Sequence, residues 1–229
     1  KARSVEGMRD IIEHGEFQAL INSSDKLFNI EVEDVVNSLA VLPRKSVVVV
    51  FGLSGAGKQF AINAIISCLI KKGRSVLTVN QDNYYKKENL PQDDKGHSNY
   101  DVLDATDWDW FIKDISHLLS GKKIQIPISK SADAGKKEAV LADILMLDGL
   151  YTYDSRITRM LEERDIQCFK LGIICVPDMM LTGDNLLLSS DVRGLRRINR
   201  DISKWDLNKI FRRFLLAKKG ERKHILPFL

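Results

Sequence analysis

The sequence has few cysteines and no long apolar run. Its three cysteines (Cys68, Cys168 and Cys175) are an odd number without a CxxC spacing, which argues against a disulfide framework and for a reducing compartment. We expect them to be buried as small hydrophobic side chains. The longest apolar run, Val47–Phe51, is far shorter than the ~20 residues that a membrane-spanning helix needs. With no secretory signal pattern at the start, these absences predict a soluble, cytoplasmic protein without a membrane partner.

Composition and charge exclude several other classes. Hydrophobic residues make up 44% of the 229 residues and charged residues 29%, so disordered, collagenous and coiled-coil chains are excluded. The net charge of +4 is too small to choose between anionic small molecules and nucleic acid. No basic stretch is interleaved with aromatic residues, which makes a nucleic-acid partner unlikely. The four histidines are scattered, and no two of them have the spacing of metal ligands.

Apolar patterns divide the chain into two parts. Helical spacing over residues 4–23 and 34–42 predicts an N-terminal helical extension, residues 1–45. The following domain, 46–229, alternates strand and helix patterns, as expected of a three-layer α/β/α fold with a mostly parallel sheet. A protein partner or a second copy of the chain could bind through residues 1–43. The predicted strands are 46–51, 76–79, 124–128, 144–147 and 171–176, and the predicted helices are 60–70, 108–119, 155–163 and 191–203.

A glycine-rich segment separates the first predicted strand from the next helix. The segment fits GxxxxGK, a pattern in which glycines let several N–H groups converge on phosphate oxygens and the lysine reaches the β and γ phosphates. This predicts binding of ATP or GTP. The residues concerned are Gly52, Ser54, Gly55, Ala56, Gly57 and Lys58.

The residue after that lysine departs from the full pattern. A serine or threonine hydroxyl usually binds Mg²⁺ at this position, but this chain has Gln59. An amide oxygen can coordinate the ion with a different geometry. We expect the change to affect phosphoryl transfer more than nucleotide binding.

Two carboxylates follow predicted strands. Asp148 ends the apolar strand 144–147 and is a candidate for holding Mg²⁺. Asp82 follows the strand 76–79, at the edge of the sheet where ligands of such folds bind, although an aspartate there can also be a turn or cap residue. Tyr84 and Tyr85 come next, and they could line a binding site or be buried.

Five ordered motifs resemble the uridine kinase branch of P-loop kinases, which also includes phosphoribulokinase and the bacterial pantothenate kinase. The resemblance covers residues 46–227. Besides GLSGAGK, the motifs are QDNYYK (81–86), NYDVLDATDWD (99–109), LDGLYTYDSRI (147–157) and DVRGLRRINRDI (191–202). The last of these is similar to an arginine-rich helix that forms a lid in the family.

The resemblance implies specific roles. Lys58 would bind the phosphates, Asp82 would be the base toward the acceptor hydroxyl, and Asp148 would be the metal-linked acid. Tyr85 and Tyr100 would lie near the acceptor. Three arginines, Arg193, Arg196 and Arg197, would close over the transferred phosphate. Arg193 would also contact the acceptor, and Arg197 would also contact the nucleotide.

The arginines have a meaning apart from the resemblance. Arg193, Arg197 and Arg200 fall on neighbouring turns of a helix and could present guanidinium groups to a polyphosphate. A solvated basic face or an RNA-binding patch would have the same pattern.

Four features depart from the family. Gln59 replaces a hydroxyl and Asp148 a glutamate; residues 129–137 lack the histidine that holds the nucleoside in uridine kinases, and residues 202–206 lack further lid arginines. The sequence favours a kinase that uses Mg²⁺ and transfers phosphate from ATP or GTP to a hydroxyl group of a nucleoside or a sugar-like alcohol. The alternative is a degenerate kinase that binds nucleotide and acts as a regulatory or assembly module. A retained base at Asp82 favours the enzyme, because a purely binding protein needs none.

Overall fold

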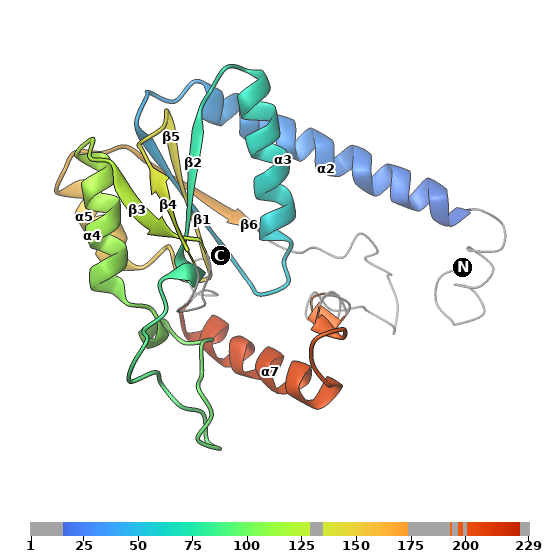
Figure 1. The fold of residues 1–229 in the computed structure, drawn as a ribbon. Coiled ribbons are helices and arrows are strands. Elements are labelled where there is room, and N and C mark those ends of the chain that lie inside the picture. Colours follow the sequence, from blue (N-terminus) through green and yellow to red (C-terminus); the bar gives the residue numbers. More distant parts are fainter. Residues whose placement is uncertain (1–15, 129–134, 174–192, 194–196, 199–200, 225–229) are drawn as a thin grey trace.

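Four parallel strands form the central sheet. The computed structural model describes residues 16–128, 135–173, 193, 197–198 and 201–224 (Figure 1). The strand order is β2–β5–β1–β6, and all neighbouring pairs are parallel. Helices on both faces of this sheet confirm the predicted α/β class. The strands are β1 (Ser46–Gly52), β2 (Val76–Asn80), β5 (Ile144–Asp148) and β6 (Cys168–Ile173).

Strand β1 lies inside the sheet and is buried along its whole length. Val47 and Val49 belong to one hydrophobic cluster, and Val48 and Val50 belong to another, because successive side chains of a strand point to opposite faces. The run of valines therefore packs against two helical layers, which explains why the strand shows no alternation of polar and apolar residues.

The first helical layer consists of α2 (Glu16–Ala40) and α3 (Lys58–Lys71). Val36 and Leu39 of α2 join the cluster that contains Val48 and Val50. The C-terminal part of α2 therefore packs on the core, while its N-terminal part extends beyond the sheet (Figure 1). Where two apolar stretches were predicted, the described residues form one continuous helix; residues 1–15 lie outside the description.

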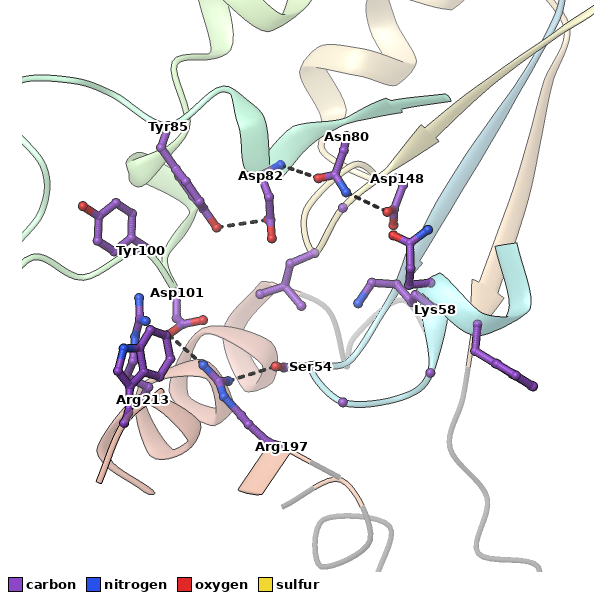
Figure 2. A pocket seen from close by; sticks show the side chains of 17 residues that line it. Ser54, Lys58, Asn80, Asp82, Tyr85, Tyr100, Asp101, Asp148, Arg197 and Arg213 are labelled. Carbon is purple, nitrogen blue, oxygen red and sulfur yellow. Dashed lines mark hydrogen bonds and ion pairs between the residues drawn. The ribbon is translucent and has the colours of Figure 1, made fainter. Parts of the chain in front are cut away.

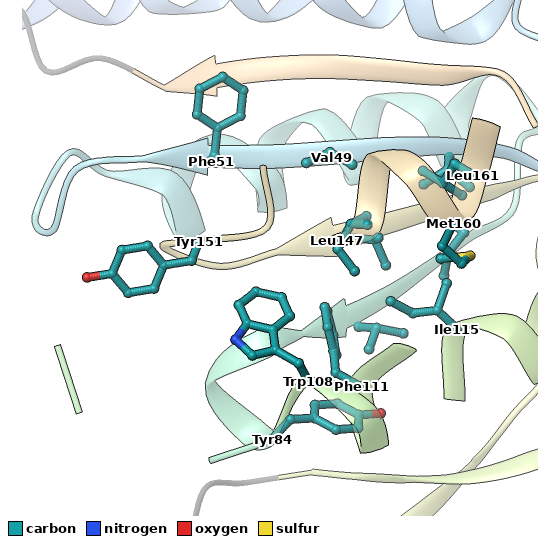
Figure 3. Packing of buried hydrophobic residues seen from close by; sticks show 14 of the residues in the cluster. Val49, Phe51, Tyr84, Trp108, Phe111, Ile115, Leu147, Tyr151, Met160 and Leu161 are labelled. Atoms are coloured by element: carbon teal, nitrogen blue, oxygen red, sulfur yellow. The ribbon is translucent and has the colours of Figure 1, made fainter. Parts of the chain in front are cut away.

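The second helical layer covers the opposite face. It consists of α4 (Trp108–Leu119) and α5 (Ser155–Glu162), close to the two predicted helices. Each helix begins after an aspartate whose side chain accepts a main-chain N–H: Asp107 from Trp110 and Asp154 from Arg156. Aromatic and aliphatic side chains of this layer pack together under the sheet (Figure 3).

The predicted strand 124–128 lies outside the central sheet. Strand β3 (Ile124–Pro127) pairs with β4 (Lys136–Ala139) in a separate antiparallel hairpin. The β4 sequence, KKEA, is mostly exposed, and it has no apolar run from which a strand could be predicted. The hairpin packs on the rest of the molecule through Ile126 and Ala139, which belong to the hydrophobic cluster under the sheet. Asn83 adds a side-chain hydrogen bond of 3.1 Å to the Pro127 carbonyl.

A C-terminal helix crosses the carboxyl edge of the sheet (Figure 1). The sequence reading did not predict this helix, α7 (Leu207–His224), although Ile210, Phe214 and Ala217 recur at helical spacing and are buried. Of the predicted helix 191–203, only residues 193, 197–198 and 201–203 are described. No helix in the described ranges is long and apolar enough to span a membrane.

Candidate active site

The loop between β1 and α3 has the backbone that its glycines predicted. Gly55 and Gly57 have φ values of 77° and 95°, a region that residues with a Cβ avoid. A Cβ at Gly55 would lie 2.8 Å from the main-chain oxygen of Arg193, so the close approach of another segment also requires glycine there. The loop ends at the first turn of α3, where main-chain N–H groups favour bound phosphate.

Lys58 is held inside this loop. Its Nζ donates hydrogen bonds of 2.9 Å to the Gly52 carbonyl and 3.3 Å to the Leu53 carbonyl. Burial lowers the pKa of Lys58, while the nearby carboxylates, of which Asp148 has the largest effect, oppose that change. When a nucleotide binds, the Lys58 ammonium can exchange its hydrogen bonds with the loop carbonyls for hydrogen bonds with phosphate oxygens, because charged phosphate oxygens are stronger acceptors.

Strand register brings Asp148 next to Asn80. The two residues are paired at the ends of β5 and β2, and Asn80 Nδ2 donates a hydrogen bond of 2.9 Å to Asp148 Oδ2 (Figure 2). The carboxyl group is 4% exposed. Burial raises its pKa from 3.8 to about 6, Lys58 lowers it, and Asp82 raises it. A cation bound at this edge would lower the pKa again, because it favours the ionised carboxylate.

Asp82 lies in the short 3₁₀ turn that follows β2, η1 (Gln81–Asn83). Its main-chain N–H donates a 2.8 Å hydrogen bond to Asn80 Oδ1, so Asn80 connects the two carboxylates. Tyr85 donates a 3.0 Å hydrogen bond from its hydroxyl to Asp82 Oδ1, and its ring lies edge-on to Tyr100 at 5.0 Å (Figure 2). The carboxylate and the two rings thus form a continuous surface.

The side chain of Gln81 holds the 3₁₀ turn η1 in place. Its side chain is buried, donates a 2.8 Å hydrogen bond to Thr106 Oγ1, and accepts a 2.9 Å hydrogen bond from the Tyr151 main chain. Both amide atoms are therefore used. These bonds fasten the end of β2 to two other loops and hold Asp82 in position.

A cavity of about 450 Å³ lies between these residues and α7. It brings together most of the predicted site residues, and Figure 2 shows Lys58 and Asp148 on one side and Tyr100 and Arg213 on another. The predicted residues in its wall are Ser54, Gly55, Gly57, Lys58, Gln59, Asp82, Tyr85, Tyr100, Asp148 and Arg197.

Arg197 reaches the cavity and Arg193 does not. Arg197 Nη1 donates a 2.9 Å hydrogen bond to Ser54 Oγ. Arg193 was predicted to contact substrate, but in the structure it is buried, with 4% of its surface exposed. Its Nη1 donates hydrogen bonds to the Glu221 carboxylate (2.9 Å) and to the Ser54 carbonyl (3.0 Å). Arg193 therefore connects α7 to the phosphate loop.

Two predicted loop residues lie outside the cavity wall, and two arginines of the predicted lid are not described. Gly52 and Ala56 belong to the loop but not to the cavity wall. The Ala56 N–H donates a 3.1 Å hydrogen bond to the Leu53 carbonyl, which shapes the turn. Arg196 and Arg200 lie outside the described residues.

Tyr84 is a core residue, which contradicts its predicted contact with substrate. It is completely buried, packs against Trp110 and Phe111, and donates a 3.1 Å hydrogen bond from its hydroxyl to Asp114. The 3₁₀ turn directs neighbouring tyrosines to different sides: Tyr84 goes to the core and Tyr85 to the cavity.

Gln59 lies in the cavity wall and contacts its own helix. Its Nε2 donates a 2.9 Å hydrogen bond to Asn63 Oδ1, one turn later. In the described part of the chain, no cluster of three or more His, Cys, Asp or Glu residues could hold a metal. Mg²⁺ does not need such a cluster, because it is usually bound by one or two carboxylates together with waters and substrate phosphates.

Several site residues were not predicted as such from the sequence. Asn80 directly precedes the motif 81–86 and Asp101 lies within the motif 99–109, so their positions near Asp82 and Tyr100 were a usable signal. Arg213 and Glu221 could not be predicted as site residues, because the helix α7 that carries them was not predicted. The unpredicted residues are Phe60, Asn80, Asp101, Gly149, Leu150, Trp205 and Arg213 in the cavity wall and Glu221 behind the phosphate loop.

The fold is that of the P-loop kinases. The structure resembles two solved structures that show the same fold: a kinase assigned to a fructose transport system from Silicibacter sp. TM1040 (TM-score 0.53, 15% identity, 80% of this chain and 87% of that one), and a "possible uridine kinase" from Bacillus stearothermophilus (TM-score 0.51, 15% identity, 86% and 96%).

Sequence comparison identifies the family. The model of the phosphoribulokinase/uridine kinase family matches residues 47–227, so the chain belongs to this family. Uridine kinase of Leuconostoc citreum (strain KM20) is 29% identical over 162 residues, which are 68% of each chain. Uridine kinase of Staphylococcus aureus (strain JH9) is 27% identical over 161 residues, again 68% of each. The expected resemblance is confirmed.

Proposed function

We propose that the chain transfers the γ-phosphate of ATP or GTP to a hydroxyl group of a small acceptor, most simply a nucleoside or sugar-like alcohol. The observation that carries this proposal is that Asp82 and Lys58 face the same cavity. A carboxylate for the acceptor and a cation for the donor phosphates are the two groups that such a transfer needs most. The family membership supports the same reaction class.

The residues divide the reaction between them. Lys58 and the loop N–H groups bind the donor phosphates, and Asp82 orients the acceptor hydroxyl and accepts its proton. As the acceptor oxygen bonds to the γ-phosphorus, the bond from phosphorus to the bridging oxygen breaks, and the nucleoside diphosphate leaves with that oxygen. The Tyr85 hydroxyl, 3.0 Å from Asp82 Oδ1, fixes the carboxylate in one orientation.

Mg²⁺ fits the carboxyl edge of the sheet. Asp148, directly or through water, and Gln59 would hold it; the ion would neutralise charge on the phosphates. Asn80 keeps the Asp148 carboxylate directed along the cavity wall through their 2.9 Å hydrogen bond.

The test is the Asp82→Asn variant, compared with Asp104→Asn at an exposed position. Nucleosides and sugars are incubated with labelled ATP and scored for phosphorylated product. We expect Asp82→Asn to lower kcat by about 10²-fold or more and to leave ATP affinity unchanged, because the base acts in the transition state. Full turnover in this variant would contradict the mechanism.

A nucleotide-binding module without efficient transfer is the second candidate. It is favoured by Gln59, which replaces the usual hydroxyl and bonds to Asn63. For this function, the wild-type protein binds ATP but forms no product from any acceptor. Asp82→Asn would then change no measurable property of nucleotide binding.

A further inference from the structure

Arg213 is a cation in the cavity wall that is held by aromatic rings. Its guanidinium carbon lies 4.5 Å from the ring centroid of Trp205 and 5.8 Å from that of Tyr100. Figure 2 shows Arg213 near Tyr100 in the cavity wall. Cation–π contacts fix the position of a guanidinium group, but aromatic rings accept none of its hydrogen bonds in the plane. Its N–H donors therefore remain available to a ligand in the cavity.

The other cations near this cavity are already engaged. Lys58 donates to two loop carbonyls, and Arg197 lies 3.8 Å from carboxylate oxygens of Asp101 and Asp201. Arg212, the neighbour of Arg213, pairs with Asp93 at 3.0 Å. The ion pairs between residues that the structure describes do not include Arg213.

The contacts of Arg213 place it on the acceptor side. Tyr100, which it contacts, lies 5.0 Å from the Tyr85 ring, and Tyr85 donates its hydroxyl hydrogen bond to Asp82. Two ring contacts thus connect the guanidinium group to the base. A compact acceptor whose hydroxyl meets Asp82 would extend along these two tyrosines toward Arg213.

We propose that the acceptor carries an oxyanion, a phosphate or a carboxylate group, and that Arg213 binds this group while Asp82 receives the acceptor hydroxyl. A guanidinium fork matches both groups through paired N–H donors. The Asp101 carboxylate in the same wall lies 3.8 Å from Arg197. A neutral acceptor would therefore leave Arg213 without an ion-pair partner. The inference rests on the proposed function, since it assigns the substrate class of the same site.

A donor phosphate is the other source of an oxyanion. The loop, Lys58 and Arg197 surround the side of the cavity where Ser54 lies. Arg213 instead contacts Tyr100 and Trp205, so we assign it to the acceptor. The experiment separates the two sources by measuring acceptor and nucleotide independently.

Binding is measured by calorimetry with the full chain saturated with MgADP, so that the phosphate loop is filled. The probes are three matched pairs: glycerol and glycerate, ribose and ribose 5-phosphate, and uridine and uridine 3′-phosphate. Wild-type protein should bind the anionic member of at least one pair about tenfold or more tightly than the neutral member. Arg213→Gln should abolish this preference, whereas Arg212→Gln, which removes an equal charge outside the cavity wall, should keep it.

Turnover with the same pairs supplies the second readout. Arg213→Gln should raise KM for the anionic acceptor about tenfold or more and leave KM for ATP unchanged. A raised KM for ATP alone would assign Arg213 to the donor and overturn the proposal, as would equal binding of both members in every pair. If anionic members bind through Arg213 but none is phosphorylated, the inference stands and the proposed function fails.

Discussion

The Glu221 carboxylate in α7 accepts a hydrogen bond from the main-chain N–H of Ser54 in the phosphate loop, 167 residues earlier in the chain. The same carboxylate accepts a 2.9 Å hydrogen bond from Arg193. Both side chains are almost fully buried. The last helix is therefore fastened to the loop that precedes α3, and changes in α7 should be felt at the site of nucleotide binding.

Glu221→Gln should destabilise the chain by about 3 kcal/mol, because the Arg193 charge would stay buried without its carboxylate. Glu138→Gln is the control: its partner Lys123 is exposed, and removal of such a pair should change the free energy of unfolding by less than about 1 kcal/mol. Urea denaturation measures both values. Equal, small losses would show that the buried pair contributes little.

Gly55→Ala should weaken ATP binding as well as stability. Gly55 and Gly121 have the same φ of 77°, but a Cβ at Gly121 meets no atom within 4 Å, whereas one at Gly55 would lie 2.8 Å from the Arg193 carbonyl oxygen. Gly121→Ala should therefore show only the backbone penalty, about 1 kcal/mol. Thermal unfolding and ATP titration compare the variants, and equal effects would contradict the importance of the close approach.

Lys58→Ala should lower ATP affinity about 10-fold to 100-fold, since it removes a charge-assisted hydrogen bond to phosphate. The ligand-free chain should keep its fold, because burial already disfavours this cation and lowers its pKa. Lys71→Ala, at the exposed end of the same helix, should leave affinity unchanged. Calorimetry gives the affinities, and unchanged binding in Lys58→Ala would refute the loop assignment.

Asp148→Asn should stabilise the metal-free chain at neutral pH. Burial raises the pKa of Asp148 from 3.8 to about 6, so the folded state holds a proton that the unfolded state loses between these values, and stability falls as the pH rises through this range. Well above pH 6 the full penalty, on the order of 3 kcal/mol, opposes folding. The asparagine variant lacks it.

Urea denaturation in EDTA tests this pH dependence. The gain from Asp148→Asn should be largest at about pH 8 and vanish below about pH 3, where the carboxyl is neutral in both states. Asp104→Asn, at an exposed position, provides the control. A gain that does not vary with pH would point to packing instead of charge.

Gln59→Thr should raise Mg²⁺-dependent turnover, because it restores a hydroxyl next to Lys58. Asn63→Ala is the matched variant: it removes the partner of the 2.9 Å hydrogen bond from Gln59 without supplying a hydroxyl, and should give no such gain. Initial rates over a range of Mg²⁺ concentrations decide between them. If neither variant responds, the metal is held without position 59.

The local parts of the site could be predicted from the sequence. The buried strand β1, the glycine loop and the helix α3 follow one another directly, and each has its own pattern: a β-branched run, glycines at left-handed positions, and an apolar helix. Asp82 and Asp148 could also be placed, because the carboxyl ends of parallel strands meet at one edge of a sheet. Register then brings Asp148 beside Asn80.

Tertiary structure decided which neighbouring residues enter the cavity. Tyr84 and Tyr85 are indistinguishable by pattern, and only the 3₁₀ turn fastened by Gln81 sends the first into the core and the second toward Asp82. Arg193 and Arg197 lie one helical turn apart, yet one is neutralised by Glu221 and the other faces the cavity. These differences arise because the deciding partners come from distant segments: Gln81 is held by Thr106 and Tyr151, and Arg193 is held by Glu221 of α7.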